Sequence, residues 1–502
     1  MQIRTYSATS DGIDGTLIEV EAALQNALPQ MMVTGLPGEV VKESRERVKA
    51  SLQNMGFQVP TGKILIHLSP AMDKKQGSQF DLSIALLCLQ AENILLSPVL
   101  PYMAFFGELS LDGRLKPVKG ILPMVDVCEK AKEVRQIIIP KENEKDVRFL
   151  RSSKIRIASH LVDVIDFVRG EEDLPCSEFR PLIRNEIDET PLFDSIIGQE
   201  HAKKAVAVAI AGGHHLLMVG PAGVGKSLIA SASPELLPSL NEEEILDLKK
   251  IYGSNGIDFE MQKRPFRSPH HGISANALLG GGKGCVTPGE VSLSHYGILF
   301  LDEFPEFKRD AIEGLREPME SGVIHVHRVG SAKTLPSQFT LIAAMNPCPC
   351  GNAIGKSARC LCRPEKALAY RRKISGAILD RIGLCVVLLS PKENPQNHPS
   401  FKGQVLKKQI EKAFERQKRR FKNSKRKNGS VTRLDDSSDF TLQGSAKEVL
   451  DDLLTKNEVS YRKISQLKKV SRTIADMDES ECIQDKHLWE AWSYRLPDFS
   501  RF

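Results

Sequence analysis

The stretch HLLMVGPAGVGKS, residues 215–227, decides the fold, because an apolar run is followed directly by a glycine-rich loop and a helix-compatible segment. The loop fits G-x-x-x-x-G-K-[ST], in which glycines let backbone N–H groups and a helix N-terminus face a polyanion. Lys226 offers a positive charge to the β- and γ-phosphates, and the Ser227 hydroxyl can bind Mg²⁺. The three glycines are Gly220, Gly223 and Gly225. A plain strand-to-helix turn is the alternative, but the complete context favours a phosphate-binding loop.

A second apolar strand, residues 297–301, ends in two carboxylates. Buried parallel strands present their carboxyl ends to bound phosphates. Asp302 is therefore predicted to hold Mg²⁺ through water, and Glu303 to orient and deprotonate the attacking water. A core strand with a solvated acidic end is the alternative, and the phosphate loop upstream argues against it. The two stretches together predict an α/β nucleotide-binding fold.

With 502 residues, the chain is long enough for about three domains of usual size. The 41% hydrophobic and 26% charged content is ordinary for a soluble globular protein. No segment approaches the ~20 apolar residues of a membrane helix, and the N-terminus lacks the apolar core of a signal peptide. We therefore expect a cytoplasmic protein with no membrane partner.

Positive charge is concentrated in one segment, although the net charge is only +6. Residues 402–427 carry twelve lysines and arginines against two glutamates. Such a run is either a solvated linker or a nucleic-acid contact, and the sequence leaves both open.

Four of the ten cysteines are clustered as Cys348-Pro-Cys350 and Cys360-Leu-Cys362. Four thiolates can bind tetrahedral Zn²⁺, although the C-x-C spacing departs from the commoner C-x2-C. Four ordinary thiols are the alternative, which is awkward because exposed paired thiols oxidise. We expect a structural zinc, since four protein ligands leave no open position.

Long motifs then carry a family resemblance. They are RPFRSPHH at 264–271, Leu-x-Gly-Gly-Gly at 278–282, PGEVSLSH at 288–295, LFLDEFPEF at 299–307 and AAMNPCPCG at 343–351. This set resembles the magnesium-chelatase-like AAA+ proteins of the ComM type, over essentially the full chain. The resemblance implies a homo-hexameric ATPase that acts on branched or duplex DNA during natural transformation.

The resemblance also implies an α/β fold in several parts. These are a non-proteolytic Lon-protease-like α+β domain of the ribosomal S5 type (1–170), a linker (171–192), an AAA+ core with a parallel sheet, flanking helices and the cysteine loop (193–395), a basic linker (396–440) and a helical lid (441–502). Patterning predicts helices over 40–55, 80–91, 308–320, 445–456, 461–476 and 485–494, and strands over 63–68 and 136–140.

The N-terminal part resembles the Lon protease domain in its turn at 77–82 and its hairpin at 107–115. A Lon-type protease needs a serine nucleophile beside a lysine base. Alignment of the turn puts Gln79 at the serine position, and the lysine position falls on Leu122. We therefore predict no peptidase activity, with Ser78 next to the nucleophile position as the one reservation.

In the AAA+ core, the resemblance assigns further residues to the ATP site. Ile197, in an Ile-x-Gly-Gln-like stretch, would line the adenine pocket, the alternative being an ordinary capped helix start. Asn346 matches the sensor-1 position, and Arg462 the sensor-2 position. Arg381 would be the arginine finger supplied to the neighbouring subunit's ATP. Arg371 and Arg372 are the alternatives to Arg381.

Two loops are candidates for DNA contact. The insert over 275–289 would project toward a central pore with Lys283 at its tip, although a glycine-rich loop with one lysine is common on any surface. Two strands over 323–339, expected to be joined by residues 330–333, would form a hairpin with Arg328 and Lys333 near its tip. Phosphate contacts of this kind would be salt-dependent and largely sequence-independent.

The sequence thus predicts an ATP-dependent DNA motor with helicase or branch-migration activity, working with single-stranded, forked or branched DNA and with recombination proteins. Two rivals use the same core. A magnesium-chelatase motor subunit is disfavoured by the Lon-like region and the cysteine cluster. A protein-remodelling AAA+ machine is disfavoured because no aromatic pore loop is evident near Gly280.

Overall fold

The computed structural model describes the chain in two compact units. The first comprises residues 1–183 and 246–260, and the second comprises 184–245 and 261–502. The described residues are 3–58, 60–71, 75, 77–180, 189–257, 259, 263–282, 286–328, 331–354, 360–389, 401–422, 425–431, 440–456 and 460–495. Lys283 lies outside them, as does the side chain of Arg328.

The first unit is built on a seven-stranded mixed sheet of order β3-β4-β2-β1-β5-β8-β9. Its strands are β1 (Ile3–Asp11), β2 (Asp14–Gln25), β3 (Gln30–Thr34), β4 (Lys63–Ser69), β5 (Met103–Phe105), β8 (Gln136–Pro140) and β9 (Ile155–Ala158), with a small hairpin of β6 (Glu108–Leu109) and β7 (Leu115–Lys116). Its helices are α1 (Glu39–Asn54), α2 (Asp81–Ala91), α3 (Ile121–Lys130), α4 (Glu144–Val147) and α5 (Leu161–Arg169). The helices predicted over 40–55 and 80–91 are confirmed, and so are both predicted strands.

The two positions that correspond to a Lon-type dyad are buried in this unit. Gln79 precedes α2 and Leu122 lies in the first turn of α3, and both side chains are almost fully covered. Neither residue type can act as a nucleophile or a base, so the absence of peptidase activity stays our prediction.

The expected linker over 171–192 begins later than predicted. Leu174 is buried in the core of the first unit, and Cys176 forms an isolated bridge with Arg156 in β9. Residues 171–176 therefore belong to the packed unit, because an apolar side chain in this segment finds a place in its core.

The second unit contains a five-stranded parallel sheet of order β11-β14-β17-β10-β18. The strands are β10 (Leu216–Val219), β11 (Phe266–Arg267), β14 (Ile298–Leu301), β17 (Thr340–Met345) and β18 (Leu384–Val387). Along β10, Leu216 and Met218 enter one hydrophobic cluster, and Leu217 and Val219 enter another. Both faces of the sheet are therefore covered, which explains why its strands are continuous apolar runs.

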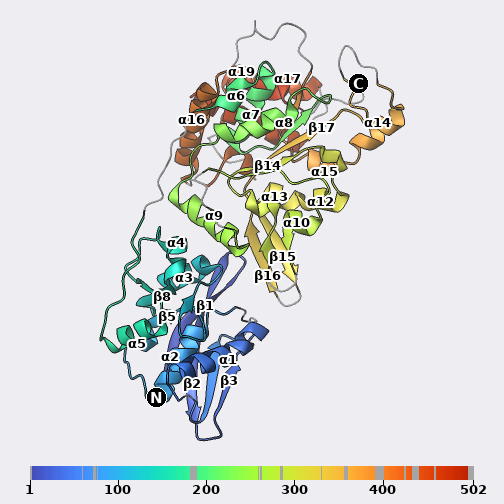
Figure 1. Ribbon diagram of the computed structural model, residues 1–502. Helices are drawn as coiled ribbons and strands as arrows, with labels where there is room; N and C mark the ends of the chain where they lie inside the picture. The colour runs from blue at the N-terminus through green and yellow to red at the C-terminus, as the bar shows by residue number, and fades with distance from the viewer. Residues whose placement is uncertain are drawn as a thin grey trace. The chain divides into compact units, whose positions relative to one another are not determined.

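Helices cover the two faces (Figure 1). One face carries α6 (Pro191–Ser195), α7 (Glu200–Gly212), α8 (Lys226–Ala232), α16 (Gly403–Phe421), α17 (Gly444–Lys456), α18 (Tyr461–Met477) and α19 (Asp485–Ser493). The other carries α10 (Ala275–Leu279), α11 (Glu290–Leu293), α12 (Arg309–Gly314), α13 (Arg316–Ser321), α14 (Pro364–Arg371) and α15 (Gly376–Leu379). The helix α9 (Glu242–Ser254) begins in this unit.

Two local predictions need correction. The helix expected over 308–320 is divided into α12 and α13, because Pro318 has no N–H to donate to the Gly314 carbonyl. In the hairpin of β15 (Val323–Arg328) and β16 (Ser331–Pro336), Lys333 is not part of the connection. It lies within β16 opposite Val326. Figure 1 shows the hairpin extending from the core beside α13.

The expected basic linker over 396–440 also needs correction, because residues 403–421 form the helix α16. Leu406, Ile410 and Ala413 recur at helical spacing and are buried against α7 and α18. The exposed positions of the helix carry its charge, including Lys408 and Lys412. The run of basic residues thus hides an amphipathic helix of the C-terminal part.

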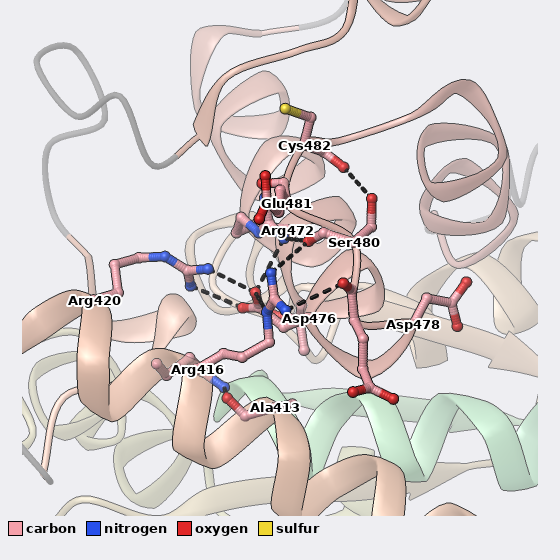
Figure 2. A network of polar contacts seen from close by, with 12 residues as sticks. Ala413, Arg416, Arg420, Arg472, Asp476, Asp478, Ser480, Glu481 and Cys482 are labelled. Carbon is pink, nitrogen blue, oxygen red and sulfur yellow. Dashed lines mark hydrogen bonds and ion pairs between the residues drawn. The ribbon is translucent and has the colours of Figure 1, made fainter.

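A buried carboxylate fixes α16 to α18 (Figure 2). Asp476 of α18 accepts two hydrogen bonds from Arg420, at 2.6 and 2.8 Å. Arg472 lies 3.1 Å and Arg416 3.6 Å from the same carboxylate. Asn428 donates a further hydrogen bond of 2.9 Å. Arg472 is fully buried, which makes its role structural.

In the described part of the chain, no helix combines the length and the apolar character that crossing a membrane requires.

Candidate nucleotide site

The phosphate loop connects β10 to α8 at the carboxyl edge of the parallel sheet. Gly223 and Gly225 have φ angles of 78° and 94°, which lie in the left-handed region that favours glycine. The Gly220 N–H donates to the Met345 carbonyl at 3.2 Å, and a Cβ on Gly220 would lie 2.6 Å from the Leu388 carbonyl oxygen. The loop therefore packs tightly against both strands that flank β10.

Lys226 is almost buried, and its ammonium group is surrounded by oxygen acceptors. It donates to the carbonyls of Gly220 and Pro221, each at 2.7 Å, and to Asn346 Oδ1 at 3.1 Å. Burial lowers the pKa of Lys226, and Asp302 acts against that shift. Asn346 reaches Lys226 because β17 lies between β10 and β14 in the sheet. The structure thus brings the predicted sensor-1 residue to the phosphate loop.

The predicted magnesium ligands are also in contact. Ser227 Oγ donates to Asp302 Oδ2 at 2.6 Å. A hydroxyl and a carboxylate at the end of neighbouring elements are ligands that Mg²⁺ prefers, so the pair fits this ion. Glu303 follows with a φ of 50°, and its side chain is more than half exposed at the same edge.

His271 faces the predicted general base, and sequence reasoning gave it no role. Its Nδ1 lies 3.3 Å from Glu303 Oε2, and its ring packs against that of His270 with centroids 4.1 Å apart. The pair of histidines in the 264–271 motif was the available signal. A histidine here can orient the Glu303 carboxylate or share a proton with it.

Ile197, the predicted adenine-pocket residue, is 63% exposed. Two residues later, Gln199 has a φ of 58°, and its side-chain amide donates to the Leu389 carbonyl at 2.8 Å. Its side chain also lies 3.5 Å from the carbonyl of Val224, in the phosphate loop. The Ile197 segment is thus anchored beside the loop.

Arg381 and Arg462 lie at the opposite, amino edge of the same sheet. Arg381 lies just before β18, and β18 runs parallel to β10. The phosphate loop follows β10, so the length of a four-residue strand, about 13 Å, separates Arg381 from the phosphate loop of its own chain. Arg381 Nη2 lies 2.5 Å from Glu320 Oε2, and Arg462 Nη2 lies 3.6 Å from the same atom. Sequence reasoning missed Glu320, because nothing local connects it to either arginine.

Both arginines line a cavity of about 490 Å³, here called the arginine cavity. Its wall also includes the amino ends of β10, β14, β17 and β18. The ionisable residues of the wall are His214, His215, Glu244, Arg264, Glu320, Arg381, Lys425, Lys427, Arg462 and Lys469, with Tyr296 and Tyr461. Six of them are lysine or arginine and two are glutamate, so the cavity is basic. Burial lowers the pKa of Lys427 to about 7.

The alternatives to Arg381 lie elsewhere. Arg371 donates from Nε to the Pro347 carbonyl at 2.9 Å, directly after Asn346, and Arg372 is exposed at the end of α14. Neither is among the residues that line the arginine cavity.

The four clustered cysteines converge as the sequence predicts. Their sulfur atoms all lie within 4.8 Å of one another, and three of the separations are 3.3, 3.6 and 3.7 Å. Hydrogen bonds, chiefly from the Asn352 N–H, lower the pKa of Cys350 to about 6. Burial raises the pKa of Cys348, so the four thiols do not ionise alike. Four soft sulfur ligands this close together could hold a metal ion.

Comparison with known proteins follows this geometry. The family model for magnesium chelatase, subunit ChlI, matches residues 192–396, and models for subunit ChlI of Mg-chelatase and for its C-terminal part match 20–143 and 401–495. Competence protein ComM of Haemophilus influenzae is 36% identical over 501 residues, covering 98% of this chain and 96% of that protein. The chain belongs to the magnesium-chelatase-like ComM/YifB family.

Further relatives agree with this family. YifB of Escherichia coli is 37% identical over 495 residues, covering 97% of this chain and 96% of that protein. The archaeal Lon protease of Thermococcus kodakarensis is 28% identical over 187 residues, which is 36% of this chain and 29% of that protease. Membership of the ComM/YifB family implies an AAA+ ATPase that binds ATP with Mg²⁺, and the carboxyl edge has the residues for both.

Proposed function

We propose that this protein is an ATP-dependent DNA motor, with helicase or branch-migration activity, that assembles as a homo-hexamer and acts in natural transformation and homologous recombination. One observation carries the proposal. The phosphate loop and the arginines that would complete it lie at opposite edges of one sheet, so ATP at a subunit interface could contact both. The name of the Haemophilus relative supports the biological setting.

Each residue at the carboxyl edge then has a role in hydrolysis. Lys226 would move from its carbonyl acceptors to the β- and γ-phosphates. Glu303 would accept the proton of the attacking water, while Asn346 orients that water beside the γ-phosphate. Ser227 and Asp302 would hold Mg²⁺, which neutralises charge on the phosphates. Arg381 and Arg462 of a neighbouring subunit would stabilise the negative charge of the transition state.

The hairpin β15–β16 and the insert that carries Lys283 would transmit hydrolysis to DNA. The backbone of Arg328 pairs with that of Ser331 at the end of the hairpin, and Lys333 lies two residues further along β16. Cations at such positions contact phosphates without reading sequence. We also propose that the Lon-like first unit is a DNA-binding scaffold without peptidase activity and that the four cysteines hold a structural Zn²⁺.

The test compares the ATPase rate with and without forked or four-way-junction DNA, at two salt concentrations. We expect strong stimulation that fades with salt and is lost in Glu303→Gln. Lys333→Ala should reduce the salt slope by about one counterion. A rate that DNA leaves unchanged and an unfolded protein raises would replace the DNA motor with a protein-remodelling machine.

A magnesium-chelatase-type motor is the second candidate, because the matching family models describe that enzyme. It predicts ATP-dependent metal insertion into a porphyrin when the partner subunits are supplied, and no stimulation by DNA. The same ATPase assay therefore separates the two.

A further inference from the structure

The cysteine cluster lies next to the nucleotide site in sequence and in space. Cys348 follows Asn346 by two residues, and Asn346 contacts Lys226. On the other side of Cys350, the position of a Cβ built on Gly351 would lie 3.6 Å from the backbone nitrogen of Ala222. Ala222 belongs to the phosphate loop. One short segment, residues 346–351, thus links the cluster to two walls of the ATP site.

The sulfur geometry suits a metal. Zinc bound to four thiolates at about 2.3 Å places neighbouring sulfurs about 3.8 Å apart. The observed separations of 3.3, 3.6 and 3.7 Å approach that value. Backbone N–H groups of Asn352 and Ala353 point to Cys348, and that of Leu361 points to Cys350. These hydrogen bonds orient the sulfur atoms, as an outer shell around a metal does.

Hydrogen bonds and apolar packing hold residues 346–351 in place. The Arg371 side chain donates to the Pro347 carbonyl at 2.9 Å, and the Gly351 N–H donates to the Cys348 carbonyl at 2.9 Å. Ile354 and Tyr370 belong to the same hydrophobic cluster as Val219 and Met345, which precede the phosphate loop and Asn346. A displacement of residues 348–351 would therefore change the packing beside the phosphate loop.

We propose that Zn²⁺ on Cys348, Cys350, Cys360 and Cys362 controls the ATP site by holding residues 346–351 against the phosphate loop. This inference rests on the proposed ATPase function and adds a regulation to it. With zinc, the four cysteines are cross-linked and Asn346 is held at Lys226. Without zinc, contacts between the four thiols do not hold residues 346–351 in place, and ATP binds and reacts poorly. Coupling between sites is reciprocal, so bound nucleotide must also tighten zinc.

The first experiment measures this reciprocity on the full-length protein. Zinc content is determined for the purified chain, and zinc is then removed by titration with a chelator, with and without a non-hydrolysable ATP analogue. We expect one zinc per chain and about tenfold tighter retention with the analogue, a typical coupling between two sites. Equal retention under both conditions overturns the coupling, and so does a zinc-free protein with full affinity for the analogue. Absence of zinc from the purified chain overturns the metal site.

Variants separate a local effect from unfolding. The double variant Cys350→Ser/Cys362→Ser should lose zinc, and its Kd for the analogue should rise about tenfold. Cys482→Ser, which replaces an exposed thiol of the same unit, is the control and should leave the Kd unchanged. Gly351→Val retains all four thiols but places a branched side chain at a φ of 80° facing the phosphate loop. It should keep zinc and still weaken the analogue. Unchanged affinity in the serine variant after zinc is lost contradicts the proposal, and unchanged affinity in Gly351→Val contradicts the role of the 346–351 segment.

The outcomes also distinguish this inference from the proposed function. If DNA does not stimulate ATP hydrolysis, the motor proposal fails while the two binding measurements still decide the coupling. If DNA stimulates hydrolysis equally in the zinc-loaded and zinc-free protein, the motor stands and the coupling fails.

Discussion

The two edges of the five-stranded sheet differ in how complete they are. At the carboxyl edge, Lys226 contacts Asn346, and Ser227 contacts Asp302, within one chain. At the amino edge, Arg381 and Arg462 share Glu320 across a basic cavity. The comparison teaches that one chain carries an assembled phosphate site at one edge of the sheet and a basic cavity at the other. In the proposed hexamer, the cations of that cavity would face the phosphates bound by a neighbouring subunit.

Removing the arginine tests this comparison most severely. We expect Arg381→Ala to lower kcat for ATP about a thousandfold, because a trans-acting arginine stabilises transition-state charge. Mixing it with Lys226→Ala, itself inactive, should restore part of the rate. Mixed assemblies contain interfaces with one intact phosphate loop and one intact arginine. Steady-state ATPase assays across mixing ratios measure this, and no recovery at any ratio would argue against a shared site.

Removing the general base breaks the carboxyl edge alone. Glu303→Gln should lower kcat about a hundredfold or more, because proton abstraction from water is lost. Nucleotide affinity should be unchanged, as measured with a fluorescent ATP analogue. Glu306→Gln is the matched control, since that carboxylate pairs with Lys373 at 2.9 Å. Equal loss in both variants would show a structural defect instead.

Acid should weaken the amino edge through two buried histidines. Burial lowers the pKa of His214 to about 3 and that of His215 to about 4. The His215 ring accepts the Leu341 N–H at Nδ1 and contacts the Met319 carbonyl at Nε2, an arrangement that requires the neutral ring. Because both pKa values lie below that of an unfolded histidine, stability is complete above pH ~6.5 and falls as protons bind the unfolded chain. Each histidine should remove about 2 kcal/mol by pH 5.

Denaturant unfolding at several pH values measures this loss. His215→Gln should flatten the acid limb, while His325→Gln, a half-exposed histidine in the hairpin, should leave it unchanged. A stability that is constant between pH 7 and 5 would contradict the burial argument.

The smallest effect is expected at Glu320, which holds both arginines. Its carboxylate is 53% exposed, so Glu320→Gln should cost less than about 1 kcal/mol of stability. The ATPase rate should be maintained or rise, because the arginines are released. Thermal unfolding and ATPase assays measure both, with Glu317→Gln as a neighbouring control. A loss of rate as large as that of Arg381→Ala would make Glu320 part of the hydrolytic site.

Sequence reasoning found the residues that local motifs define. Lys226, Ser227 and Asp302 were predicted because strand, loop and carboxylate signals are contiguous, and the structure brings them together. The convergence of the four cysteines was predicted from their clustering. Glu320 and His271 were missed, because their partners are set by the order of strands, and strand order is a property of long-range packing.

The basic segment shows a different limit. Twelve positive charges concealed the apolar spacing of Leu406, Ile410 and Ala413, so α16 was predicted as a linker. Lys333 was placed in a turn because Gly330 is a strong turn former, whereas β16 begins directly after it. Tertiary packing and strand pairing outweighed local composition in both cases.

The cluster of three arginines on Asp476 has a consequence for digestion by trypsin. That protease cleaves after lysine and arginine, and it needs several residues in extended form. The segment 403–421 is rich in cleavage sites, yet it is helical and is tied to α18 through Arg416 and Arg420. Cleavage there must wait until the carboxylate is released and the helix opens. The rate of tryptic cleavage in this segment therefore measures how often the C-terminal helices open, and each basic residue is a site at which that opening can be detected.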